Sequence, residues 1–280
     1  MSKFDRGMDM ARSSWAVLRQ DKELMALPVV GGIVTLIAMF GLLAPFALIS
    51  DTATTTSERA GSDPSGGAVL LMFIGVIVAF FGIVLVTQIF AGAVVHGAYT
   101  RMTGGDPSFS SSLKGALSAT RQLIPWAIAT GTVGVVVDQL RDAGMIGRII
   151  AGFINFAWKT ATFIVLPILV IEKLGARAAY NRSRDLMGGL YGDSAVANFG
   201  LGLAGLIGGL IGIGLLFAGS AMGPGVGSVF VLLGLIWLIG LTVVLQTLTG
   251  VMRAAFYLYA VDQQVPAHFN EAQFRTAFGS

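Results

Sequence analysis

Residues 68–95 read AVLLMFIGVIVAFFGIVLVTQIFAGAVV, and this stretch decides the fold of the protein. It lies in a run without Lys, Arg, Asp or Glu between Asp63 and Arg101. Because a bilayer core about 30 Å thick is crossed by roughly 20 apolar residues in a helix, the stretch predicts a membrane-spanning helix. The composition agrees, since 55% of the 280 residues are hydrophobic, 12% are charged and the mean hydropathy is +0.79. These values are typical of a membrane protein.

Two other uncharged runs predict three further spans. The first lies between Glu23 and Asp51. The second extends from residue 194 to residue 252, and Pro224 interrupts it between two glycines. Since Pro with flanking Gly breaks a helix, we expect this run to form a hairpin of two spans. The four spans are expected near residues 27–49, 68–95, 196–220 and 229–252.

The middle of the chain predicts two more spans, near residues 122–138 and 149–171. The first is short, and the second carries Lys159 near its centre. Thinning of the bilayer accommodates a short span. Apolar neighbours offset the roughly 3 kcal/mol that one Lys costs on insertion. We therefore predict six spans, and the alternative is a four-span protein in which this middle pair is re-entrant.

The basic residues predict the orientation. With six spans, most of the 18 Lys and Arg residues fall on the side of the two termini, and only Arg59, Arg141 and Arg148 fall in the opposite loops. Since cytoplasmic loops are enriched in Lys and Arg, we expect a protein of the plasma (inner) membrane with both termini in the cytoplasm. The predicted organisation is a cytoplasmic amphipathic segment at 1–26, a six-span domain at 27–252 and a cytoplasmic tail at 253–280.

The N-terminal segment predicts an amphipathic helix. Apolar residues recur there at spacings of three and four, at Phe4, Met8, Ala11, Trp15 and Leu18. Such a helix lies on the membrane surface, and packing against the bundle is the alternative. The expected fold class is therefore all-α, a polytopic transmembrane helical bundle with six spans and an N-terminal interfacial helix.

The inventory of reactive residues argues against several classes of function. The chain has no Cys and 2 His, which excludes a disulfide framework, a thiolate metal site and a cysteine nucleophile. A net charge of +3 is too small to predict nucleic-acid binding. The G-x-G-x-x-G match at residues 200–205 lies inside a predicted span, without the preceding strand that a dinucleotide site needs. We expect no catalytic residues, no cofactor and no metal, and enzymatic activity is left open.

Lys159 is the leading candidate for a binding residue, because a cation within a span is by default a functional hypothesis. Asp138 and Asp142, at the end of the third predicted span, are its candidate partners, and a structural or snorkelled Lys is the alternative. The most basic loop adds Arg177, Arg182 and Arg184 as candidates for binding anionic lipid headgroups. The alternative is that these three residues only set the orientation.

The predicted fifth span is rich in glycine. Gly205 with Gly209, and Gly208 with Gly212, form small-xxx-small pairs that let helix backbones approach closely. We expect a tightly packed helix, which is also the candidate surface for a homo-oligomer or another membrane partner.

Several positions carry a family resemblance, together with the glycine-rich hairpin. They lie before and around the first and fourth predicted spans, at Trp15, Leu18, Asp21, Leu24, Pro28, Trp158, Pro167, Glu172, Ser183 and Leu186. The chain resembles a family of uncharacterised bacterial and archaeal six-helix membrane proteins with a domain of unknown function. That family is distantly similar to the membrane anchor of some glycerophosphodiester phosphodiesterases. The resemblance implies a fold and a location but no activity, and Lys159 departs from the neutral residue expected at its position.

Two functions follow as hypotheses. The first is a non-enzymatic membrane component that organises lipids or protein partners at the cytoplasmic face, suggested by two basic interfacial segments. The alternative is a small transporter or channel that uses Lys159 at mid-membrane. A continuous polar or water-filled path at mid-membrane that contains Lys159 would favour the transporter. A filled apolar core with its conspicuous surfaces on the cytoplasmic side would favour the organising role.

Overall fold

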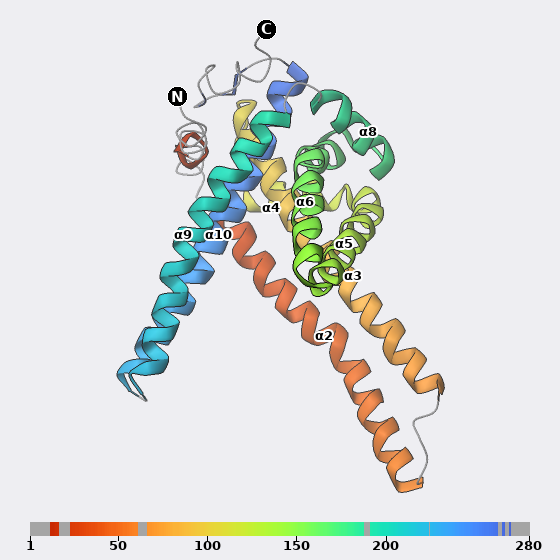
Figure 1. Ribbon diagram of the computed structural model, residues 1–280. Coiled ribbons are helices and arrows are strands. Elements are labelled where there is room, and N and C mark those ends of the chain that lie inside the picture. Colours follow the sequence, from red (N-terminus) through yellow and green to blue (C-terminus); the bar gives the residue numbers. More distant parts are fainter. Residues whose placement is uncertain are drawn as a thin grey trace.

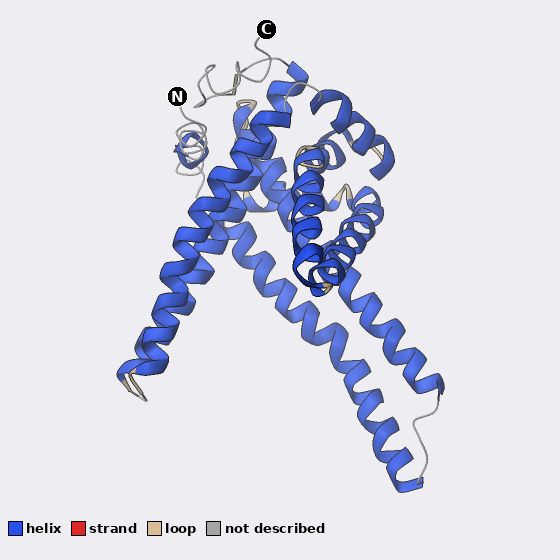
Figure 2. Ribbon diagram, in the orientation of Figure 1, coloured by secondary structure: helices blue, strands red, loops and turns tan. Residues whose placement is uncertain are grey.

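The computed structural model describes residues 12–16, 23–60, 66–187, 191–223, 225–262, 265–266 and 269. Figure 2 shows that this part of the chain consists of helices and short loops, without a strand. The all-α fold class is therefore confirmed. Residues 12–16 are helical, and the rest of the predicted N-terminal amphipathic helix lies outside the described residues.

Five helices are longer than the spans predicted for them, whereas the fourth predicted span, 149–171, is divided among α6, α7 and η1. In chain order they are α2 (Glu23–Ala60), α3 (Gly66–Met102), α4 (Phe109–Leu117), α5 (Thr120–Asp142), α6 (Gly144–Ala161), α7 (Val165–Pro167), the π-helix η1 (Ile168–Glu172), α8 (Ala176–Met187), α9 (Tyr191–Ala221) and α10 (Val226–Asp262).

Five of these helices are long and apolar enough to cross a membrane, namely α2, α3, α5, α9 and α10. A sixth candidate is formed by α6 with residues 165–172, which are bent by 43° at a short break. This bend matches either a broken span or a re-entrant loop, so both alternatives for the middle pair remain.

Three helical hairpins diverge from one packed end of the molecule (Figure 1). The hairpins are α2–α3, α5–α6 and α9–α10, and the packed end contains α4, α7, η1 and α8 with the adjoining parts of α3 and α10. The helices α5 and α6 have 23 and 18 residues, whereas α2, α3, α9 and α10 each have 31 to 38. The α5–α6 hairpin therefore reaches less far than its neighbours.

The packed end holds the hydrophobic core. Its buried residues come from the start of α2, the second half of α3, the segment around α7 and the end of α10, and include Leu24, Leu27, Val95, Phe163, Ile168, Leu169, Met252 and Phe256. The hairpins instead expose large apolar side chains such as Phe40, Phe73 and Phe217. Bilayer lipid is the natural cover for such surfaces.

Pro167 explains the break between α6 and α7. A proline ring clashes with the carbonyl of the residue four positions earlier, here Phe163, and removes a backbone donor. Accordingly α6 ends at Ala161 and the helix resumes at Val165. The break places Lys159 in the last turn of α6, next to the packed end.

The glycines of α9 pack against α10, as the sequence predicts. A Cβ added to Gly208 would lie 2.8 Å from the Leu241 side chain, and one added to Gly212 would contact Leu238. A Cβ added to Gly209 would meet nothing within 4 Å, so Gly209 does not belong to this contact face. The tight helix pair is confirmed, while association with a second copy stays a prediction.

A candidate binding cavity at Lys159

A cavity of about 380 Å³ lies where α3, α5, α6 and α10 meet the break before α7. Polar side chains from all four helices line it, and they include Gln88, Asp138, Arg141, Asn155, Lys159 and Arg253. Lys159 therefore lies at a polar cavity rather than in a filled apolar core.

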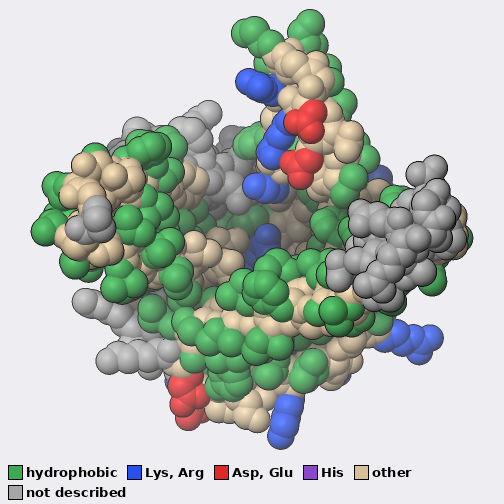
Figure 3. Space-filling model, turned by 90° about the horizontal axis from the view of Figure 1, so that it is seen from below, with side chains coloured by type: hydrophobic (Ala, Val, Ile, Leu, Met, Phe, Trp, Pro, Cys, Tyr) green, Lys and Arg blue, Asp and Glu red, His purple; other side chains and the backbone are tan. Residues whose placement is uncertain are grey.

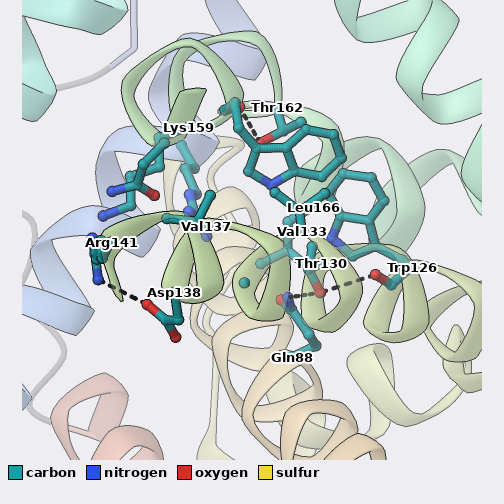
Figure 4. Close-up of a pocket in the computed structure, with 14 residues that line it drawn as sticks. Gln88, Trp126, Thr130, Val133, Val137, Asp138, Arg141, Lys159, Thr162 and Leu166 are labelled. Carbon is teal, nitrogen blue, oxygen red and sulfur yellow. Dashed lines mark hydrogen bonds and ion pairs between the residues drawn. The ribbon is translucent and has the colours of Figure 1, made fainter. Parts of the chain in front are cut away.

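The cavity holds more positive than negative charge. Three of its lining residues are cationic, namely Arg141, Lys159 and Arg253, and Asp138 is its one carboxylate. Asp138 Oδ1 lies 2.9 Å from Arg141 Nη1, one turn away on α5. In Figure 4 the side chains of Lys159 and Arg141 lie on one side of the cavity, and the dashed line joins Arg141 to Asp138. Lys159 and Arg253 form no ion pair with any residue that the structure describes.

The predicted partnership between Lys159 and Asp138 needs correction in one respect. The structure brings both residues to one cavity, as the hypothesis requires. The ion pair of Asp138, however, is made with Arg141, because the two residues face the same way at a spacing of three on one helix. Lys159 is thus left as a positive charge exposed to the cavity.

Arg253 is the site residue that the sequence analysis missed. It was assigned to the cytoplasmic tail, but α10 continues to Asp262 and residues 254–260 are buried in the packed end. Its Nε atom is buried without a hydrogen-bond partner among the described residues, and its guanidinium carbon lies 5.7 Å from the centre of the Phe163 ring. The apolar stretch AAFYLYAV that follows Arg253 was the available signal that the helix continues.

Aromatic and hydrogen-bonded contacts stiffen the walls of the cavity. Trp126 of α5 and Trp158 of α6 stack with their ring centres 5.8 Å apart and an interplanar angle of 15°. Gln88 Nε2 of α3 donates to Thr130 Oγ1 of α5 over 3.3 Å, and this bond links two helices across the cavity wall. These contacts join α3, α5 and α6, so helices rather than a loop hold the walls of the cavity.

The three arginines of the predicted basic loop lie elsewhere. The loop forms α8, and Arg177, Arg182 and Arg184 are exposed on it and do not line the cavity. Arg182 Nε lies 3.7 Å from Glu172 Oε2, and Glu172 Oε1 accepts a hydrogen bond of 3.0 Å from Tyr257. The candidate binding residues therefore form two separate groups, one in the cavity and one on the surface of α8.

A second, largely apolar groove of about 660 Å³ lies between α2, α3 and α10. Its few polar side chains are Thr35, Thr87, Thr242 and Gln246, and none of the described residues that line it is charged. Among the described residues, no three His, Asp or Glu side chains gather in a way that could hold a metal ion. The cavity at Lys159 is thus the place where charged groups converge.

Comparisons with known proteins give a family but no activity. No curated protein and no solved structure matches the chain. The model of a family described as a family of unknown function, DUF6159, matches residues 67–267, a range that contains every residue of the Lys159 cavity. Because this match covers well over half of the 280 residues, the chain belongs to the DUF6159 family.

Proposed function

We propose that the protein is a multi-pass membrane protein that binds an anionic group at Lys159 and Arg253, as the binding site of a small transporter would. The observation that carries this proposal is the cavity of about 380 Å³ with two cationic side chains that no described carboxylate neutralises. The alternative function drawn from the sequence thereby becomes the leading one.

The physical argument concerns the cost of an unpaired charge. A cation surrounded by apolar helices loses hydration, and a counter-ion recovers much of this loss. Lys159 supplies three N–H donors, and the Arg253 guanidinium supplies a planar set that fits carboxylate or phosphate oxygens. The donor set therefore favours an oxyanion over a cation or a neutral solute.

We extend the proposal to location and topology. The distribution of Lys and Arg supports the plasma (inner) membrane with both termini in the cytoplasm. The short helices of the α5–α6 hairpin and the 43° bend after α6 support the re-entrant alternative, in which this hairpin enters and leaves on the side of the packed end. Either topology keeps both termini on one side.

Charged thiol reagents test the anion site. Because the chain has no Cys, Asn155→Cys creates one thiol, and it lies in the cavity. In vesicles of neutral phosphatidylcholine, we expect an anionic thiol reagent to react several-fold faster than a cationic one. Lys159→Gln should remove this preference, and Lys114→Gln on the exposed face of α4 should preserve it. Equal rates for both reagents would contradict the proposal.

The organising role at the cytoplasmic face is the second candidate. The observation in its favour is α8, which exposes Arg177, Arg182 and Arg184 while Ala179 and Ser183 are buried against the packed end. Such a helix is suited to anionic headgroups. This role would agree with the expected likeness to the membrane anchor of some glycerophosphodiester phosphodiesterases. Replacing the three arginines by Gln should then reduce recovery of the protein with anionic vesicles without changing thiol reactivity at residue 155.

A further inference from the structure

We infer that the anionic group bound at Lys159 and Arg253 is the phosphate of a membrane phospholipid with a net negative charge, whose acyl chains lie in the hollow between the three hairpins. This inference rests on the proposed anion site and names its ligand. It concerns a different surface from the arginines of α8, none of which lines the cavity.

The shape of the molecule is the first argument. Figure 3 shows a hollow between the diverging hairpins, with apolar side chains around it and atoms of Lys or Arg at its floor. The Lys159 cavity likewise combines apolar and cationic lining, since the side chains of Trp126, Val133 and Leu166 line it beside the cations. An apolar wall with a cationic floor matches an amphiphile with an anionic head.

The level of the cations along the helices is the second argument. Arg253 lies about 40 Å along α10 from Val226, at about 1.5 Å per residue. A bilayer core is about 30 Å thick. If the α9–α10 turn lies at one membrane surface, Arg253 lies near the headgroups of the opposite leaflet, on the side of the packed end. A phospholipid of that leaflet would reach the two cations without its phosphate leaving headgroup level.

The route to the cavity is the third argument. The hairpins that bound the hollow expose large apolar side chains such as Ile37, Val78 and Phe217, and only lipid or another apolar surface covers these favourably. A lipid therefore fills the hollow and neutralises its floor in one step. A free anion would neutralise the floor but leave the apolar walls uncovered.

Lipid retention tests the inference. The protein is reconstituted in vesicles of phosphatidylcholine with a minor fraction of phosphatidylglycerol, extracted in a neutral mild detergent, and the retained lipids are measured by mass spectrometry. We expect phosphatidylglycerol to be enriched several-fold over its fraction in the vesicles. Lys159→Gln should abolish the enrichment, and the surface variant Lys114→Gln should retain it.

A second variant, which fills the cavity without changing a charge, tests the inference even if Lys159→Gln does not fold. Gly134 lines the cavity, and a Cβ added there would meet nothing within 4 Å. Gly134→Leu should therefore fold and yet displace the lipid. Gly209→Leu on α9, where an added Cβ also has open space, is the matched control and should keep the lipid. Equal retention by these two variants would overturn the inference.

Protection of the Asn155→Cys thiol separates the two sources of phosphate. We expect phosphatidylglycerol in the vesicles to slow modification of this thiol, and inorganic phosphate to have little effect. Protection by inorganic phosphate without lipid enrichment would overturn the lipid inference and leave the anion site standing. If neither phosphate source protects and the reagents show no charge preference, both proposals fail.

Discussion

The packed end and the three hairpins cover their apolar side chains in different ways. At the packed end, side chains far apart in sequence, such as Leu24, Phe163 and Phe256, cover one another almost completely. Along the hairpins, large apolar residues such as Phe40 and Phe217 stay exposed for lipid to cover. The difference teaches that the tertiary fold of this protein is concentrated at one end.

The candidate cavity lies at the boundary between these two regions. Lys159 is in the last turn of α6 before the break, and Arg253 is in α10 where the helix enters the packed end. The rigid side supplies fixed positions for the charges, and the open side supplies access. A binding site needs both properties.

The largest difference in stability between the packed end and the hairpins is expected at two phenylalanines, one on each side of this boundary. Phe163 is 1% exposed and its ring centre lies 5.4 Å from that of Phe256, whereas Phe153 of α6 is 74% exposed. We expect Phe163→Ala to lower the free energy of unfolding by about 3–5 kcal/mol, because it leaves a cavity in the core. Phe153→Ala should change it little, since this side chain contacts lipid. Denaturant titration in mixed micelles measures both, and similar losses would refute the division.

The next largest effect on the free energy of unfolding is expected from substitutions of two glycines. A Cβ added to Gly97 would lie 2.6 Å from Ser112 Oγ and would contact Leu24, so Gly97→Leu overfills the packed end. We expect a loss of about 1–3 kcal/mol in the free energy of unfolding. Gly209→Leu on the open face of α9 should stay within about 0.5 kcal/mol. The same denaturant titration serves, and an equally damaging Gly209→Leu would place a partner on that face.

Trp237 tests how much the α9–α10 hairpin depends on a single polar contact. Its Nε1 donates a 2.8 Å hydrogen bond to the Gly208 carbonyl across the helix pair. Hydrogen bonds between membrane helices contribute on average about 0.6 kcal/mol, so Trp237→Phe should cost about that amount. A loss at the level expected for Phe163→Ala would show that the hairpin shares the cooperativity of the packed end.

The smallest effect on stability is expected at Asp138. The pair that it forms with Arg141 is exposed, and exposed pairs contribute at most about 1 kcal/mol. Asp138→Asn should therefore leave the free energy of unfolding nearly unchanged. It should also free the Arg141 charge and speed the reaction of an anionic reagent with the Asn155→Cys thiol. An unchanged rate would mean that the cavity does not sense these charges.

The helices and one half of the site could be predicted from local sequence. Long uncharged runs predict membrane-spanning helices because the bilayer imposes a length and an apolar composition on every crossing segment. Lys159 stood out for the same reason, as a charge where the pattern predicts none. Arg253 did not stand out, because it follows the last predicted span and only the continuation of α10 into the packed end places it in the cavity.

Two other features show the limit of pattern analysis. The short helix α4 follows from a capping box at Ser108 and Ser111 and from a bond that the Phe109 amide donates to Glu23, which is distant in sequence. The partner of Asp138 is likewise set by geometry, since Arg141 lies one turn away and Lys159 belongs to another helix. A hydropathy pattern predicts neither a contact between distant segments nor the partner of a charged side chain.

The sequence by itself determined that this protein is helical, apolar over most of its length and free of thiol chemistry. Only the tertiary structure decided which helices pack, that three hairpins diverge from one end, and that Lys159 and Arg253 line one cavity. The physical reason is that burial in lipid depends on each helix alone, through its length and composition. Convergence of charges depends on the angles and breaks between helices, such as the one before α7, and these arise from contacts between segments far apart in the chain.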